Sequence, residues 1–183
     1  MKFNERDYEY FDYILGHKRD LMKAFDLLIK AEDFCKGANL TLISDEEFQT
    51  LKDNILKHDL SKLSPEEFYG YRYYFFTTEG EEKEANHIGL SGKYYFKNRF
   101  KEAWRHHYAN NPHHPEFHNY KMSKIHMLEM CLDWVAMSLK FKNNPLDYFK
   151  DKRKKLESEF GEKIDYEYVL IILANINAIY NFN

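Results

Sequence analysis

Apolar residues recur at every third or fourth position along most of the chain, a spacing that predicts helices with one buried face. The first of these helices is expected to cover residues 5–31, where Tyr10, Leu21 and Leu28 fall on the inward side. His17 falls on the same side. An inward histidine of this kind is either a hydrogen-bonded core residue, which is the commoner case, or a ligand.

The second helix is expected to run over residues 44–63, and its buried side carries three ionisable groups near its end. Continuing the helical rotation places His58, Asp59 and Lys62 on the inward face. Burying charged groups without partners costs several kcal/mol, so something must compensate them. A structural ion pair would do so, but an adjacent histidine and aspartate also converge readily on a metal ion.

Two helix starts carry the sequence pattern of a capping box. Ser44 is followed three positions later by Glu47, and Ser64 by Glu67. Pro65 suits the first position of the helix that Ser64 begins. These signals predict one helix after Ser44 and a separate, aromatic-rich helix after Ser64.

Residues 106–118, "HHYANNPHHPEFH", hold five of the nine histidines of the chain. They lie among turn-forming Asn-Asn-Pro and His-Pro pairs. A segment with this histidine density is either a metal site or an exposed, pH-sensitive surface. The apolar helices that flank it favour the metal site.

The helix expected over residues 122–141 is apolar around most of its circumference. The strongly polar residues in its middle are His126, Glu129 and Asp133, which form one narrow stripe at spacings of three and four. A helix that faces solvent normally has a wider polar face with Lys or Arg. The stripe therefore predicts an internal polar site.

The remaining pattern predicts an all-α fold, and we expect a single, compact multi-helix domain over residues 1–183. Few glycines and prolines and frequent Leu, Lys and Glu also favour helices. The other segments are expected to be an acidic, solvated loop at 77–86 and helices at 93–108, 151–160 and 166–180.

Composition narrows the classes of partner. The net charge of −3 gives no broad basic surface, so binding to polymeric DNA or RNA is not expected, whereas a small anionic ligand fits. Two distant cysteines support neither a disulfide framework nor a thiolate metal site. The N-terminal segment has no apolar signal core and no stretch is long enough to span a membrane, so we expect a cytoplasmic protein.

The order of these residues resembles that of the HD-domain superfamily of metal-dependent phosphohydrolases. "HDLSK" at 58–62 is similar to the signature dyad of that superfamily, "AWRHHYANNPHHPEFH" at 103–118 to its paired-histidine segment, and "DWVAM" at 133–137 to its closing aspartate segment. The resemblance covers about residues 10–140. The whole chain also resembles an uncharacterised branch of small bacterial and phage proteins. The resemblance to the HD-domain superfamily implies an HD-like helical bundle that acts on a nucleotide or another small phosphate ester.

Residue by residue, the resemblance implies the ligands of one or two metal ions. His17, His58, Asp59 and Asp133 would hold the first ion, with Asp59 as the bridging carboxylate. His107 would hold a second ion together with one of three loop histidines, which are His113, His114 and His118. The spacing between the dyad and these histidines departs from the usual one.

Imidazole and carboxylate ligands together suit Fe, Mn, Co or Zn. Such an ion activates water for attack on phosphorus. Lys62 would stabilise charge on the phosphate, and His114 or His118 would carry a proton to the leaving group. Two alternatives stay open: a di-iron oxygenase built on the same core, and a non-catalytic helical interaction protein held together by metal.

Overall fold

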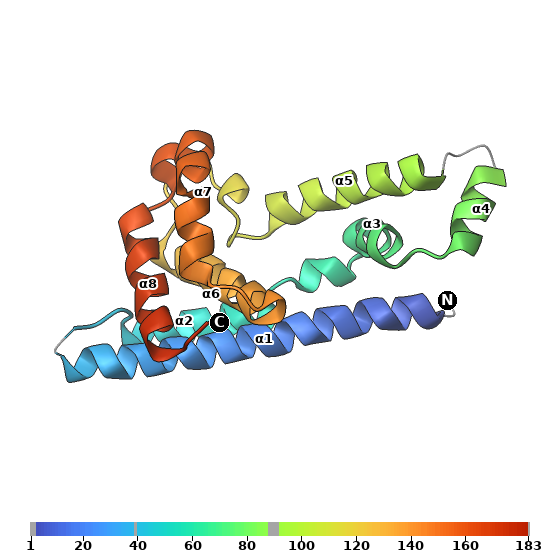
Figure 1. Cartoon of the computed structure of the whole chain (residues 1–183). Helices are drawn as coiled ribbons and strands as arrows, with labels where there is room; N and C mark the ends of the chain where they lie inside the picture. Colours follow the sequence, from blue (N-terminus) through green and yellow to red (C-terminus); the bar gives the residue numbers. More distant parts are fainter. Residues whose placement is uncertain (1–2, 39, 88–91, 183) are drawn as a thin grey trace. The chain divides into compact units, whose positions relative to one another are not determined.

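The computed structural model describes residues 3–38, 40–87 and 92–182, and over these residues it is helical with no β-strand (Figure 1). The predicted all-α fold is therefore confirmed. The α-helices of this part of the chain are α1 (Glu5–Gly37), α2 (Asp45–Lys57), α3 (Pro65–Phe76), α4 (Glu79–His87), α5 (Gly92–Asn110), α6 (Lys124–Phe141), α7 (Pro145–Phe160) and α8 (Tyr166–Ile179). Short 3₁₀ helices are η1 (Leu60–Leu63), η2 (Pro115–Phe117) and η3 (Gly161–Lys163).

The described residues divide into two compact units. Unit 1 contains residues 3–16, 59–87 and 92–111, and unit 2 contains residues 17–38, 40–58 and 112–182. The boundaries fall within α1, between His58 and Asp59, and after α5. The expectation of one domain over 1–183 stays a prediction, and each unit is described by itself.

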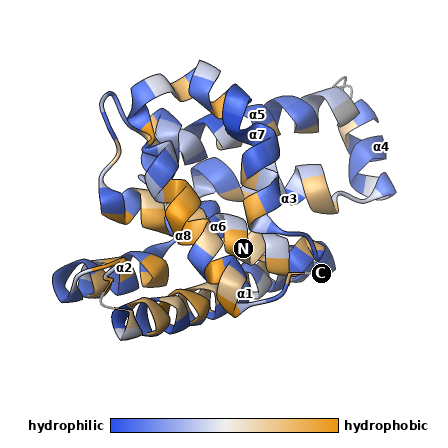
Figure 2. Cartoon of the chain, turned by 60° about the vertical axis from the view of Figure 1, so that its left-hand side comes forward, coloured by the Kyte–Doolittle hydropathy of each residue, from blue (hydrophilic) through white to orange (hydrophobic). Residues whose placement is uncertain are grey.

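Unit 2 has an aliphatic core that α6 and α8 supply in large part. Leu128, Leu132 and Val135 on α6 are fully buried, as are Ile172 and Leu173 on α8. Figure 2 shows apolar residues concentrated on these two helices. Leu21 and Leu28, which the sequence places on the inward side of the first helix, are buried in the same core.

Unit 1 has a smaller, aromatic core between the start of α1 and helices α3 and α5. Tyr10, Phe68 and Tyr71 are its buried rings, and Ala103 is its buried residue on α5. The aromatic run after Ser64 is thus helical, as the sequence predicts, and its buried rings are Phe68 and Tyr71, whereas Tyr74 and Phe75 are exposed.

The second predicted helix ends earlier than expected. α2 stops at Lys57, His58 is its C-cap, and Asp59 adopts the left-handed conformation with φ 60°. Aspartate tolerates this conformation better than most residues. The prediction that the ionisable groups share one continuous helix face is therefore wrong, although His58 and Asp59 are buried as expected.

Of the two predicted capping boxes, only the first is present. The Ser44 hydroxyl accepts from the backbone N–H of Glu47, and the Glu47 side chain accepts from the backbone of Ser44. Ser64 is the N-cap of α3, but its side chain makes no capping hydrogen bond. The Glu67 carboxylate instead binds imidazoles, because it is buried between α3 and α5.

The acidic segment predicted as a loop at 77–86 is mostly helix α4. The Thr78 hydroxyl accepts from the backbone N–H of Glu81, and the Glu81 carboxylate accepts from the backbone N–H of Thr78. This reciprocal pair is a capping box that the sequence pattern contains and that the acidic composition obscures. Glu81 also binds the buried Arg72 guanidinium at 2.7 Å.

Among the described helices, none is both long enough and apolar enough to cross a membrane.

Candidate metal centre

Unit 2 buries a cluster of imidazoles and carboxylates at the end of α2 and along α6. His58 Nδ1 lies 2.8 Å from Glu129 Oε1, and His113 Nδ1 lies 3.3 Å from the same oxygen. The His58 and His113 rings are 4.1 Å apart, centroid to centroid. The Nδ1 atoms of two neighbouring imidazoles therefore share one oxygen of Glu129.

Asp133, one turn further along α6, contacts the other nitrogen of His58. Its Oδ1 atom lies 3.7 Å from His58 Nε2 and 3.1 Å from His17 Nε2. Burial alone would raise the pKa of Asp133, but contact with the two imidazoles outweighs burial and holds the pKa well below its ordinary value. Asp133 is thus an ionised carboxylate between the histidines that the sequence identifies.

Glu129 is ionised for the same reason. Burial would raise its pKa, but the hydrogen bonds from His113 and His58 outweigh burial and lower the pKa to about 2. An ionised carboxylate only accepts hydrogen bonds, so the Nδ1 atoms of both imidazoles must donate. When these imidazoles are neutral, each Nε2 atom keeps a lone pair that can bind a metal ion.

The donor set fits a divalent transition metal. One ligand atom from each of His58, His113 and Asp133 lies within 4.8 Å of the other two, and two of these residues are buried. Two imidazole nitrogens and a carboxylate oxygen suit Fe, Mn, Co or Zn better than Ca. A buried histidine and aspartate cluster that can hold a metal ion is therefore present, as the sequence predicts.

Lys18 fixes the backbone at the end of α2. Its ammonium group donates to the carbonyl oxygens of Ile55 at 2.7 Å and His58 at 2.8 Å. These carbonyls belong to the last turn of a helix, where a cation is favourable. The sequence places Lys18 away from the inward side of the first helix, and this contact is a role that helical periodicity alone does not reveal.

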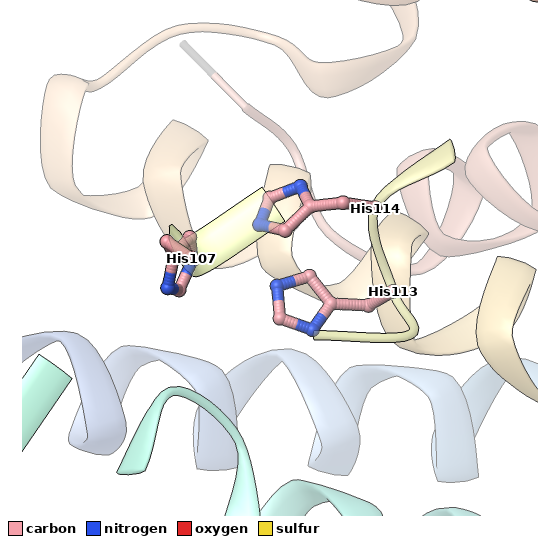
Figure 3. Close-up of side chains that lie close together, drawn as sticks. All are labelled: His107, His113 and His114. Atoms are coloured by element: carbon pink, nitrogen blue, oxygen red, sulfur yellow. The ribbon is translucent and has the colours of Figure 1, made fainter. Parts of the chain in front are cut away.

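The loop after α5 carries three further histidines of unit 2, which are His113, His114 and His118. His113 and His114 lie side by side on this loop, with ring centroids 4.1 Å apart (Figure 3). His118 Nε2 lies 2.7 Å from the carbonyl oxygen of Pro112, so it donates to the loop's own backbone. His118 thus holds the loop together, and a proton-transfer role for His114 or His118 stays a prediction.

Unit 1 contains the other predicted site residues. His107, also labelled in Figure 3, belongs to this unit, and its Nε2 atom lies 3.3 Å from Asp59 Oδ1. The other oxygen of Asp59 lies 2.5 Å from the Lys62 ammonium group. Burial would lower the pKa of His107, but the Asp59 and Glu67 carboxylates outweigh burial and raise the pKa.

Unit 2 therefore brings together His17, His58, His113 and Asp133, and unit 1 brings together Asp59, Lys62 and His107. The bridging role of Asp59 and the pairing of His107 with a loop histidine join residues of different units, so both stay predictions. The sequence pattern does not indicate the role of Glu67 and gives Glu129 only a place in the polar stripe.

A groove of about 780 Å³ lies elsewhere in unit 2. Loop residues 119–121, the last turns of α7 and the start of α8 line it. None of the predicted site residues is among its lining residues.

The fold and the site together define an all-α protein with a buried histidine and carboxylate cluster. The profile of a family of unknown function, DUF5662, matches residues 6–169, and the chain belongs to this family. No curated protein matches the chain, and no solved structure matches it. The family match carries no link to the HD-domain superfamily, so that resemblance stays a prediction.

Proposed function

We propose that the protein is a metal-dependent phosphohydrolase that acts on a small anionic phosphate ester such as a nucleotide. One observation carries the proposal: the buried cluster of His58, His113 and Asp133, whose ligand atoms lie within 4.8 Å of one another. The resemblance of "HDLSK" to the dyad of the HD-domain phosphohydrolases supplies the reaction class.

When bound, a divalent transition metal supplies Lewis acidity, which polarises a phosphoryl oxygen and makes water a better nucleophile. The residues of unit 2 that would hold the metal are His17, His58, His113 and Asp133. Glu129 keeps the imidazoles oriented, because it accepts from Nδ1 and leaves Nε2 for the metal.

Lys62 is the cation that favours hydrolysis over oxygen chemistry. Its charge would stabilise the negative charge that develops on the phosphoryl group or the leaving oxygen. Its present partner is the Asp59 carboxylate. A cation beside a candidate ligand suits a phosphate substrate, whereas oxidation of a neutral substrate gives it no evident role.

The test begins with elemental analysis of the purified protein, followed by a screen of nucleotides and simple phosphate esters under strict anaerobiosis. With Zn²⁺ or Mn²⁺ restored, phosphate release is expected in the wild type and not in Asp133→Ala, which also controls for a contaminating phosphatase. Absence of phosphate release, together with oxygen consumption by the iron-loaded protein and a substrate, would replace hydrolysis with the oxygenase alternative. A tightly bound metal without either activity would favour the non-catalytic alternative.

A further inference from the structure

Unit 1 contains a second buried glutamate that binds two imidazoles. Glu67 on α3 is fully buried, and each of its carboxylate oxygens is a hydrogen-bond partner of one histidine on α5. Oε1 lies 2.8 Å from His106 Nδ1, and Oε2 lies 2.9 Å from His107 Nδ1. Both oxygens are therefore occupied by adjacent residues of one helix.

This geometry fixes where the proton of His107 lies. Two imidazole nitrogens at hydrogen-bond distance from the two oxygens of one carboxylate require both nitrogens to donate. A neutral His107 then carries its proton on Nδ1 and a lone pair on Nε2. That Nε2 atom lies 3.3 Å from Oδ1 of Asp59.

Asn111 and Ser61 also contact His107. The Asn111 amide donates to the carbonyl oxygen of His107 at 2.7 Å and to the Ser61 hydroxyl at 2.8 Å. The Asn111 amide nitrogen and the Ser61 hydroxyl also lie 3.0 Å and 3.3 Å from His107 Nδ1. Two carboxylates contact the ring, Glu67 Oε2 at 2.9 Å from Nδ1 and Asp59 Oδ1 at 3.3 Å from Nε2. Asp59 is also paired with the Lys62 ammonium group, so the shorter contact with Glu67 favours the proton on Nδ1.

Helices α3 and α5 pack closely together beside Glu67. Gly70 is one turn beyond Glu67, and a Cβ atom there would lie 2.5 Å from Ala103 Cβ and 2.6 Å from the Arg99 carbonyl oxygen. Ala103 is one turn before His107. The absence of a side chain at Gly70 therefore lets the two backbones approach beside the carboxylate and the imidazoles.

We propose that Glu67 is a positioning residue: it holds His107 with the proton on Nδ1 and directs Nε2 toward Asp59, so that His107 and Asp59 form a pre-oriented pair of metal ligands. The metal-binding part of this inference rests on the proposed function. His106 occupies the second oxygen and restrains the carboxylate from rotating. Groups that orient a ligating histidine in this way typically change metal affinity by about 10- to 100-fold when they are lost.

The first test reads the proton position directly, by two-bond ¹H–¹⁵N spectra of metal-free, histidine-labelled protein at a pH where His107 is neutral. The wild type is expected to show His107 protonated on Nδ1. In Glu67→Gln, whose amide nitrogen cannot accept, a mixture with the Nε2-protonated form is expected. Glu66→Gln, at the neighbouring exposed position, is the matched control and should match the wild type.

A wild-type His107 protonated on Nε2 would overturn the proposal without reference to any variant. An unchanged Nδ1 form in a folded Glu67→Gln protein would overturn it as well, because Glu67 would then not determine the tautomer. Circular dichroism establishes that the variant is folded. If it is not, the wild-type spectrum alone decides the question.

The second test follows the His107 signals during titration with Zn²⁺ alone. Half-saturation of the Nε2 shift should need about 10- to 100-fold more Zn²⁺ in Glu67→Gln than in the wild type or Glu66→Gln. Equal concentrations, or a wild-type His107 that does not respond to Zn²⁺, would overturn the metal-binding part. Failure of the proposed function is distinguishable, because a protein that releases no phosphate can still show the expected tautomer and Zn²⁺ response.

Discussion

His17 Nε2 lies 3.1 Å from Asp133 Oδ1, and this contact joins α1 to α6 inside unit 2. His58 Nε2 lies 3.7 Å from the same oxygen. Two imidazoles from distant parts of the sequence thus share one carboxylate oxygen. A metal ion that takes this place would connect the same elements, so metal binding and the stability of unit 2 should be coupled.

The first prediction follows from that coupling. Asp133→Ala should lose most of the bound metal, because it removes the carboxylate of the cluster. In the wild type, a metal at 100 times its dissociation constant should add about 2.7 kcal/mol to the free energy of unfolding. Elemental analysis and thermal unfolding with and without Zn²⁺ measure the two effects.

Asp151→Ala is the control, because Asp151 is an exposed aspartate of α7 in the same unit. It should keep the metal and the metal-dependent rise in melting temperature. If Asp133→Ala retains full metal occupancy, Asp133 is not a ligand and its contact with His17 is purely structural.

The second prediction concerns the pH dependence of stability in metal-free protein. The pKa of Glu129 is lowered from 4.5 in the unfolded chain to about 2 in the folded protein. The folded state therefore favours the ionised form, and the resulting stabilisation is present above pH 4.5 and lost as the pH falls toward 2. Urea unfolding between pH 6 and pH 2 should show this loss.

Glu129→Gln should be less stable than the wild type at pH 6, and the difference should shrink as the pH falls through this window. The amide in Glu129→Gln does not titrate. The pH dependence of the free energy of unfolding of this variant therefore reports the contribution of the other groups. A constant difference between the two proteins at every pH would show that Glu129 is not ionised against His58 and His113 in the folded state.

The third prediction tests the close contact in unit 1. Gly70→Ala would place a Cβ atom 2.5 Å from Ala103 Cβ, so the helices must move apart. Overpacking of this kind costs about 1–3 kcal/mol, which outweighs the gain of up to about 1 kcal/mol in helix propensity. Chemical denaturation should therefore show a net loss of stability.

Gly80→Ala is the matched control in the same unit, because a Cβ atom there would meet only the Thr78 hydroxyl at 3.7 Å. This substitution should be neutral or stabilising. If the two alanine variants behave alike, the backbones of α3 and α5 are not constrained at Gly70.

Local sequence signals predicted most helices, because each of them is amphipathic or carries a cap. The stripe of Glu129 and Asp133 on α6 was also readable, since a narrow polar stripe on an apolar helix is costly unless it meets polar partners. Both side chains do contact histidines. These parts of the fold and site follow from periodicity and from local capping signals.

The parts that failed depend on tertiary contacts or on single backbone angles. Helical rotation could not show that Asp59 adopts φ 60° and ends the regular pattern after α2. The capping signature at Ser64 predicted a local partner for Glu67, but imidazoles from α5 compete successfully for that carboxylate. The contact of Lys18 with the end of α2 is equally invisible to a pattern read along one helix.

The last prediction separates two roles for Lys62. Its ammonium group lies 2.5 Å from Asp59 Oδ2 and 5.6 Å from the centre of the Tyr71 ring. If it stabilises charge on phosphate in the transition state, Lys62→Met should lower turnover of a phosphate ester by a factor on the order of 10². Metal content should survive, and the apolar stem of the methionine should preserve the packing.

The competing interpretation is that Lys62 only neutralises the buried Asp59 carboxylate. Its loss would then change stability and the affinity for a metal cation, because an uncompensated carboxylate attracts a cation more strongly. Turnover per bound metal ion would stay the same. Lys57→Met, at an exposed position in the last turn of α2, controls for removal of a positive charge nearby in the sequence. Steady-state kinetics normalised to metal content therefore decide the role of Lys62. A loss of turnover that is confined to Lys62→Met supports the phosphate role. Equal turnover per metal ion in both variants contradicts that role.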